Sequence, residues 1–178
     1  MVLEQFENNE YLPLFYQELE KNGPSSYNKY SLPSQLQFLA NRIATEKLCD
    51  EINKIYIVER SIVEDRFIFV ENMFRSGLLS EEELQRFDQE RLEKSRHIEP
   101  VDVFIYLRAD PHKLKERITS RGREMEKSIS LEYLHHLNDL YENNLLLELQ
   151  KNPECITMIY DVDEIDPVEL AQVVQTDL

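Results

Sequence analysis

Residues Ile55 to Phe69 read IYIVERSIVEDRFIF, and the spacing of their apolar side chains changes part-way along. The first four residues, IYIV, form a continuous apolar run that predicts a short buried strand, Ile55–Val58. Beyond them, Ile62, Phe67 and Phe69 recur at helical spacing among charged residues. The stretch therefore predicts a strand that leads directly into a helix.

Glu59, Arg60 and Ser61 lie at this predicted junction. In open parallel α/β sheets, ligands bind in the crevice beyond the carboxyl ends of the strands. Glu59 and Arg60 are therefore placed where a phosphate or a metal ion could bind. The same residues also fit a simpler interpretation, in which two solvated loop charges precede a serine that caps the helix.

Further helices and strands are predicted on both sides of this stretch. Apolar spacing, with proline and serine start signals, predicts helices over Tyr11–Leu19, from Pro33 to Leu48, from Ser80 to about Lys94, and over Pro111–Arg121, Leu131–Leu149 and Pro167–Val174. Strands are predicted at Val101–Leu107 and Cys155–Tyr160, and Val2 and Leu3 fit the tail of another strand. Because strands separated by helices pair in parallel, we expect an α/β fold with helices flanking a parallel sheet.

The composition excludes several classes of protein. A length of 178 residues fits one domain, and we expect a single domain over residues 1–178. No apolar run approaches the ~20 residues of a membrane span. The net charge of −15 argues against a nucleic-acid binder. The start, MVLEQFENNE, has no secretory or transit signal, and Cys49 and Cys155 suggest neither a disulfide nor a metal site, so we expect a cytoplasmic protein.

A second informative stretch, RITSRGREME, covers Arg117 to Glu126. Arg117 and Arg121 share a helix face, and Arg123 follows Gly122, where a helix can open into a loop. We expect that three guanidinium groups so close together cannot all pair locally and that they suit several phosphate oxygens. A solvated run of charges, balanced by the neighbouring glutamates, remains the alternative.

Together these stretches resemble the deoxynucleoside kinase family, in its deoxyadenosine, deoxyguanosine and deoxycytidine kinase branch. The resemblance rests on ERSIVEDRFIF at Glu59–Phe69, IYLRADPHKLKERITSRGREMEKSISLEYL at Ile105–Leu134, LEQFENNEYLPLFY at Leu3–Tyr16 and SQLQFLANR at Ser34–Arg42. It implies a three-layer fold like that of the P-loop kinases. The implied activity is ATP-dependent phosphorylation of a deoxynucleoside 5′-hydroxyl in nucleotide salvage, with ATP and Mg²⁺ as the implied ligands.

The resemblance also implies roles for residues at the reacting centre. Glu4 would be the general base on the 5′-hydroxyl, since that role needs a carboxylate within hydrogen-bond reach. Arg60 would hold the hydroxyl and the transferring phosphoryl group. Glu59 would help to place Mg²⁺ through water. Arg117, Arg121 and Arg123, by the same resemblance, belong to a lid that closes over the phosphates.

The substrate contacts follow from the same resemblance. Gln35 and Asp65 would read the edge of the base, with Arg42 pairing Asp65, and Tyr16 and Glu126 would hold the sugar 3′-hydroxyl. Thymidine-preferring members of the family tend to have a small residue where this chain has Asp65. We therefore expect a purine deoxynucleoside as the preferred substrate. A homodimer is also implied, with the apolar side of Phe67–Leu79 as its candidate surface.

The sequence departs from the family at its phosphate-binding loop. Of three glycines, Gly23 is the first, it is followed by Pro-Ser-Ser, and no GxxxxGK[ST] motif occurs. In the family this loop follows a strand in the middle of the sheet. Without that strand its neighbours must re-pair or leave buried groups unpaired, at roughly 1–3 kcal/mol each. We therefore expect a shortened form of a longer protein, lacking the first strand, loop and helix, with impaired activity.

Two alternatives stay open beside the kinase. A non-catalytic relative that binds nucleosides, or regulates an intact kinase, accounts for the missing loop. Another nucleotide kinase, such as one acting on thymidylate, shares the arginines of the second stretch but does not explain ERSIVEDR.

Overall fold

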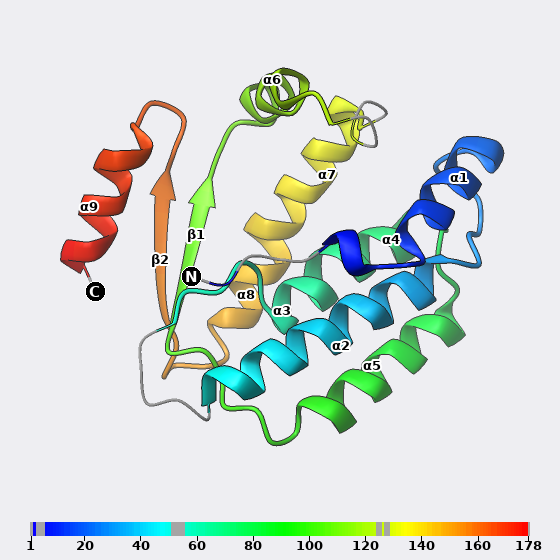
Figure 1. Ribbon diagram of the computed structural model, residues 1–178, viewed down its shortest axis with the longest axis horizontal. Coiled ribbons are helices and arrows are strands. Elements are labelled where there is room, and N and C mark those ends of the chain that lie inside the picture. The colour runs from blue at the N-terminus through cyan, green and yellow to red at the C-terminus, as the bar shows by residue number, and fades with distance from the viewer. Residues whose placement is uncertain (1, 3–5, 51–55, 124–125, 127–128, 178) are drawn as a thin grey trace. The chain divides into compact units, whose positions relative to one another are not determined.

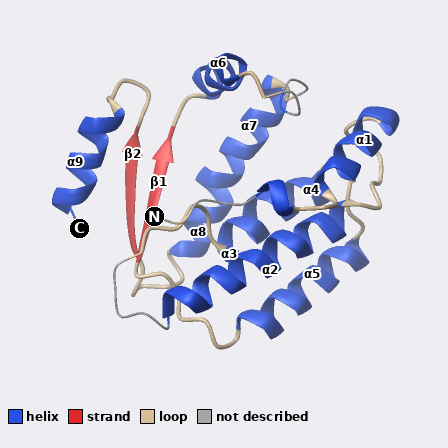
Figure 2. Cartoon of the chain, in the orientation of Figure 1, coloured by secondary structure: helices blue, strands red, loops and turns tan. Residues whose placement is uncertain are grey.

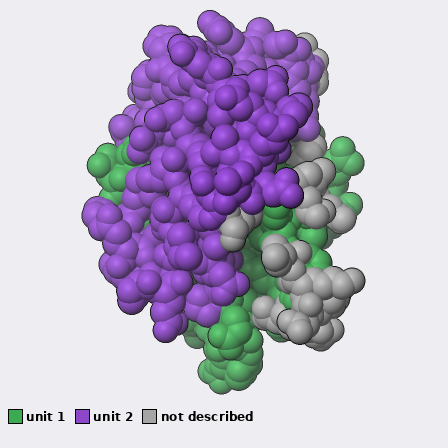
Figure 3. Space-filling view, turned by 90° about the vertical axis from the view of Figure 1, so that its left-hand side faces the viewer, with its two compact units in different colours: residues 1–99, 140–145 green, residues 100–139, 146–178 purple. Residues whose placement is uncertain are grey.

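The computed structural model describes every residue except 1, 3–5, 51–55, 124–125, 127–128 and 178. The chain divides into two compact units, and each is described by itself below (Figure 3). Unit 1 comprises Met1–Glu99 and Leu140–Leu145, and unit 2 comprises Pro100–Asp139 and Leu146–Leu178. A single domain over residues 1–178 stays a prediction.

Unit 1 is built of helices (Figures 1 and 2). They are η1 (Phe6–Asn8), α1 (Leu12–Asn22), α2 (Ser31–Asp50), α3 (Ile62–Glu64), η2 (Asp65–Val70), α4 (Glu71–Arg75), α5 (Glu81–Ser95) and η4 (Tyr141–Leu145). The elements α3, η2 and α4 follow one another without a break, and η2 is a π-helical segment between two α-helical ones. The helix predicted after the junction is therefore confirmed.

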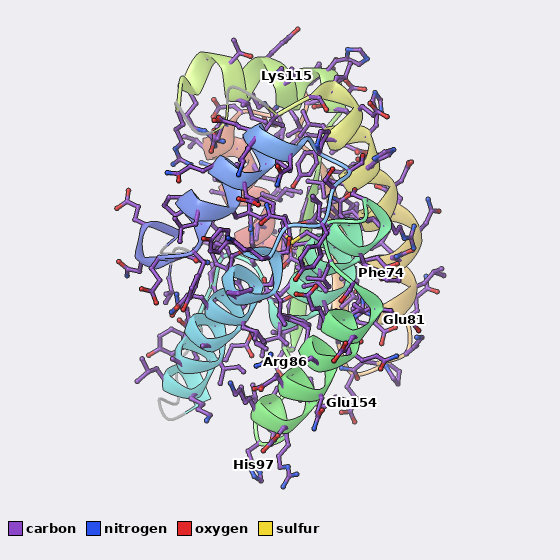
Figure 4. The ribbon with its side chains drawn as sticks, turned by 90° about the vertical axis from the view of Figure 1, so that its right-hand side faces the viewer. Phe74, Glu81, Arg86, His97, Lys115 and Glu154 are labelled. Carbon is purple, nitrogen blue, oxygen red and sulfur yellow. The ribbon has the colours of Figure 1, made fainter. Side chains whose placement is uncertain are left out.

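The core of unit 1 lies between α2, α5 and the helix that starts at Ile62. Helices α2 and α5 lie alongside each other (Figure 1). The buried apolar side chains of this core are Leu32, Leu39, Ile43, Ile62, Val70, Leu79 and Phe87. Helix α5 starts as predicted, because Ser80 and Glu83 form a reciprocal capping box. Its outer surface carries exposed charges, including Glu81 and Arg86 (Figure 4).

In its described residues, unit 2 contains a two-stranded parallel sheet and four α-helices. Its elements are β1 (Val103–Arg108), α6 (Pro111–Arg121), α7 (Leu131–Leu140), α8 (Leu146–Leu149), β2 (Ile156–Asp161) and α9 (Pro167–Asp177). The strands pair in register from Val103 opposite Ile156 to Arg108 opposite Asp161 (Figure 1). The parallel pairing predicted from the alternation of strands and helices is thus confirmed.

The strand predicted at Ile55–Val58 is wrong in its described part. Residues 51–55 lie outside the described residues, and of the other three only Val58 pairs, through an isolated parallel bridge to Val2. Ile57 is 48% exposed. An apolar run indicates only that the side chains can be buried. A β-strand also needs a neighbouring strand for its backbone hydrogen bonds, and among the described residues Val2 alone pairs with this segment.

Smaller differences concern the ends of helices. Helix α2 begins at Ser31 rather than Pro33, which is possible because proline's missing N–H group is not needed in a first helical turn. The helix predicted over Leu131–Leu149 is interrupted by the π-helical η4. Among the described residues, no helix combines the length and the apolar character needed to cross a membrane.

The surface predicted for a dimer is largely internal. Within Phe67–Leu79, the side chains of Ile68, Val70, Leu78 and Leu79 are buried in the fold of unit 1. The apolar side of this helix is therefore used for the chain's own core.

Candidate functional site

The junction between Val58 and α3 has an unusual backbone. The Val2 N–H donates to the Ile57 carbonyl at 2.8 Å, and the Glu59 N–H donates to the Val2 carbonyl at 2.9 Å. Arg60, which follows, has a φ of 65°, in the left-handed region that residues with a Cβ adopt rarely and at a cost on the order of 1 kcal/mol. Such strain is concentrated at functional sites. The junction is therefore a candidate site on backbone grounds.

Ser61 caps the following helix, as predicted. Its backbone is extended, and its Oγ accepts a hydrogen bond from the Glu64 N–H at 3.3 Å. The cap fixes the chain immediately after Arg60, while the bridge to Val2 fixes it immediately before. Arg60 is thus held between two anchored segments, and its guanidinium lies over the ring of Phe69, 4.2 Å from the centroid.

Arg42 and Asp65 form the ion pair that was predicted. Arg42 Nε donates to Asp65 Oδ2 and Arg42 Nη2 donates to Asp65 Oδ1, both at 2.8 Å. Both side chains are buried, with 7% of Arg42 and 2% of Asp65 exposed. Arg42 Nη1 donates to the Glu59 carbonyl at 2.9 Å. The guanidinium therefore ties α2 to η2 and to the end of the junction at once.

A cavity of about 300 Å³ opens beside this pair within unit 1. Its lining includes Asn41, Arg42 and Thr45 of α2, together with Glu59 and Arg60 of the junction. The volume is at the lower end of that of small-molecule pockets. A carboxylate and two guanidinium groups at one concave surface suit a ligand that carries both hydroxyl and phosphate groups.

Three predicted substrate contacts of unit 1, namely Asp65, Gln35 and Tyr16, are not part of the cavity lining. Gln35, on the second turn of α2, is only 4% exposed. Tyr16, on α1, packs edge-on against Phe15 with ring centroids 5.4 Å apart. Arg42 therefore connects Asp65 with Glu59 and Arg60 at the cavity.

Two of the three arginines of unit 2, Arg121 and Arg123, pair locally, whereas Arg117 pairs with a residue 45 positions away, so the expectation that not all three can pair locally is confirmed. Arg117 Nη2 donates to the Val162 carbonyl at 2.7 Å. Arg121 Nε and Nη2 donate to Glu126 Oε2 at 3.1 and 2.7 Å, and Arg123 Nη1 donates to Glu126 Oε1 at 3.2 Å. The carboxylate of Glu126 thus accepts from two arginines that flank Gly122, the left-handed residue that ends α6. All three guanidinium groups nevertheless stay about half-exposed.

Of the two predicted acids at the reacting centre, the structure describes Glu59, the metal contact, but not Glu4, the general base. Glu4 lies outside the described residues. Glu59 is exposed at the rim of the cavity, and the described residues contain no group of three or more His, Cys, Asp or Glu side chains that could hold a metal ion. An exposed carboxylate at this position fits Mg²⁺ that arrives with a nucleotide, because Mg²⁺ is commonly bound through one or two carboxylates plus phosphates.

Sequence reasoning missed one buried acid at the junction. Glu64 is 8% exposed, and its carboxylate accepts hydrogen bonds from Ser61 Oγ at 3.1 Å and from Tyr141 Oη at 2.9 Å. Burial raises the pKa of Glu64 above its usual value, although both hydroxyls and the charges of Arg60 and Arg42 act in the opposite direction. The spacing Ser61-x-x-Glu64, typical of a capping box, was the signal available.

Comparison with known proteins identifies the family of the chain. The chain matches the family described as "Deoxynucleoside kinase" over residues 1–176. The chain belongs to the deoxynucleoside kinase family. The expected resemblance and the expected α/β fold are thereby confirmed.

Several members of the deoxynucleoside kinase family align with most of the chain. The deoxyadenosine/deoxycytidine kinase of Bacillus subtilis (strain 168) is 32% identical over 143 residues, which cover 79% of this chain and 62% of that protein. The deoxyadenosine kinase of Dictyostelium discoideum is 27% identical, and the match covers 98% of this chain and 66% of that protein. Deoxycytidine kinase 2 of Gallus gallus is 33% identical, covering 66% and 48%. The chain thus spans between about half and two thirds of these relatives.

A solved structure has the same fold. The deoxyadenosine kinase of M. mycoides with bound dCTP superposes with a TM-score of 0.73 at 23% identity, covering 98% of this chain and 82% of that one. At this identity the match supports the fold alone.

Proposed function

We propose that this chain carries the nucleoside site of an ATP-dependent deoxynucleoside kinase, which phosphorylates the 5′-hydroxyl of its substrate in nucleotide salvage. The observation that supports it is the buried Arg42–Asp65 pair beside Glu59 and Arg60 at one cavity. Family membership adds the reaction class.

The Arg42–Asp65 pair is suited to reading the edge of a base. Both of its charges are held in place by two parallel hydrogen bonds, so a base that matches them meets a preorganised donor and acceptor. The buried amide of Gln35 offers a further donor and acceptor in the same unit. We propose a purine deoxynucleoside as the preferred substrate. Relatives named as deoxyadenosine kinases are consistent with this choice.

At the reacting centre, Arg60 would stabilise the charge that develops on the transferring phosphoryl group, and Glu4 would accept the proton of the 5′-hydroxyl. Arg117, Arg121 and Arg123 would bind phosphate oxygens after exchanging their present partners for them. Tyr16 and Glu126 would hold the sugar. Glu59 would hold Mg²⁺ through water, and the ion would neutralise phosphate charge.

A second candidate function is nucleoside binding without catalysis. The 178 residues contain no GxxxxGK[ST] motif, whose backbone amides cradle the phosphates of ATP. We therefore propose that phosphoryl transfer by these residues alone is impaired. We also propose a cytoplasmic location, and a homodimer stays a prediction that light scattering tests.

Calorimetric titration of this chain with deoxyadenosine, deoxyguanosine, deoxycytidine and thymidine tests the site. We expect saturable binding, strongest for a purine deoxynucleoside and lost in Asp65→Ala. Arg86→Ala, on the exposed face of α5, is the matched control and should bind normally. Absence of binding by the wild-type chain contradicts the proposal. Binding without transfer of labelled phosphate from ATP favours the second candidate.

A further inference from the structure

Glu64 is a buried carboxylate at the junction that no role above accounts for. It occupies the end of α3, one residue before Asp65 and three residues after the Ser61 cap. Two hydroxyl groups donate to it, one to each oxygen: Ser61 Oγ to Oε2 at 3.1 Å and Tyr141 Oη to Oε1 at 2.9 Å. A buried carboxylate with a separate donor on each oxygen has a defined orientation.

Ser61 connects this carboxylate to Arg60. The Ser61 hydroxyl both donates to the Glu64 carboxylate and accepts from the Glu64 N–H, so its rotamer is fixed from two directions. Because Ser61 directly follows Arg60, fixing Ser61 also fixes the peptide that leaves Arg60. That restraint matters at this position, since Arg60 has the φ of 65° that a residue with a Cβ avoids.

Charge joins Glu64 to the same arginine. The Arg60 and Arg42 guanidinium groups both act electrostatically on the Glu64 carboxylate. The Arg60 side chain is also restrained by the Phe69 ring, over which its guanidinium lies. Glu64 thus acts on the backbone of Arg60 through Ser61 and on its side chain through charge.

Tyr141 supplies the far anchor from a different part of the sequence. It is the first residue of η4, and η4 packs against η2 within unit 1. Both segments are π-helical, and π-turns are frequent at functional sites because they redirect side chains. The Tyr141 hydroxyl reaches the carboxylate across 77 residues of sequence.

We propose that Glu64 is a positioning residue for Arg60, with Tyr141 as the anchor that holds the Glu64 carboxylate against Ser61. This inference rests on the proposed function, in which Arg60 contacts the phosphoryl group. Loss of the Glu64 contacts then releases Arg60 while the surface that binds the base stays intact.

Two conservative variants test the proposal. Glu64→Gln keeps the shape of the side chain and removes its charge, and Tyr141→Phe removes one hydroxyl and keeps the ring. Ser80→Ala is the matched control, because Ser80 is also a helix cap but lies on α5. Arg60→Ala serves as the reference variant. The resonance that it removes from ¹H–¹⁵N spectra is the Nε–H of Arg60, and its loss of phosphate binding gives the full contribution of Arg60.

The first readout needs no ligand. We expect the Arg60 Nε–H resonance to shift or broaden in Glu64→Gln and in Tyr141→Phe, and to stay in place in Ser80→Ala. An unchanged resonance in both variants overturns the proposal.

The second readout separates the phosphate from the nucleoside. The ratio of affinities for a deoxynucleoside 5′-monophosphate and for its nucleoside measures the contribution of Arg60 to phosphate binding. We expect Glu64→Gln to lower this ratio on the order of tenfold and to leave nucleoside affinity unchanged. An equal loss of both affinities overturns positioning. If the wild-type chain binds no nucleoside but the Arg60 resonance still shifts, the proposed function fails and the positioning role stands.

Discussion

Single residues show where stability and the candidate site depend on the same contact. Asp65 is 2% exposed and neutralises Arg42, so Asp65→Ala leaves a buried guanidinium without its carboxylate. We expect this change to lower the free energy of unfolding by about 3–5 kcal/mol. The double variant Arg42→Met/Asp65→Leu should cost less than the sum of its single changes, since it removes both charges. Urea unfolding of the wild-type chain, the single variants Arg42→Met and Asp65→Leu, and the double variant measures this coupling free energy. Simple additivity of the single changes would show that the two residues are not coupled.

The strained backbone of Arg60 gives a second residue-scale prediction. At a φ of 65° glycine is free of the clash that a Cβ causes. Arg60→Gly should therefore unfold with a free energy about 1 kcal/mol higher than Arg60→Ala. At Arg86, in the middle of α5, the order should reverse by about the same amount, because glycine is the poorer helix former. The same order at both positions would argue against strain at Arg60.

Residue pairs were predictable only in part. The Arg42–Asp65 pair joins residues 23 apart, and no periodicity indicates such a contact, so only the family resemblance could predict it. Pairing of Arg121 and Arg123 with a neighbouring glutamate was one of two alternatives, and charge spacing in a loop does not decide between them because it does not report the direction of the chain. The contact between Glu64 and Tyr141 depends on two π-turns, which leave no clear signal in the apolar pattern.

At the scale of elements, an ion-pair network joins the helix after the junction to α5. Arg66 donates to Glu71 at 2.9 Å and to Asp88 at 2.7 Å, and Arg75 donates to Glu71 at 2.7 Å. Although partial burial acts to raise it, the hydrogen bonds from Arg75 and Arg66 hold the pKa of Glu71 below its usual value. A lowered folded-state pKa contributes stability that is present above the unfolded value and lost as the pH falls through the folded one.

Glu71→Gln should therefore be less stable than the wild-type chain at neutral pH, by about 1 kcal/mol. The difference in the free energy of unfolding should close as the pH falls below 4.5, the ordinary pKa of a glutamate. Urea unfolding at a series of pH values measures it. A difference that stays constant into the acid range would show that the loss comes from packing rather than from charge.

Elements themselves were predicted better than their ends. The helices starting at Pro111 and after Ser80 have start signals within their own sequence, and the structure reproduces both. Strand pairing was predicted correctly for β1 and β2 but not for Tyr56 and Ile57. The difference is physical, since helices satisfy their hydrogen bonds locally whereas a strand depends on a distant partner.

For the whole molecule the dominant quantity is the net charge of −15. Self-repulsion of this size destabilises a compact state, and it acts over a Debye length of roughly 30 Å at 0.01 M salt but only about 8 Å at 0.15 M. Salt also weakens surface ion pairs, yet these contribute only about 0–1 kcal/mol each. We therefore expect the urea midpoint to rise between these two concentrations of sodium chloride. Glu154→Lys, at an exposed position, makes the charge less negative by two and should reduce the rise. A midpoint that falls with salt would mean that networks such as Arg66–Glu71 outweigh the repulsion.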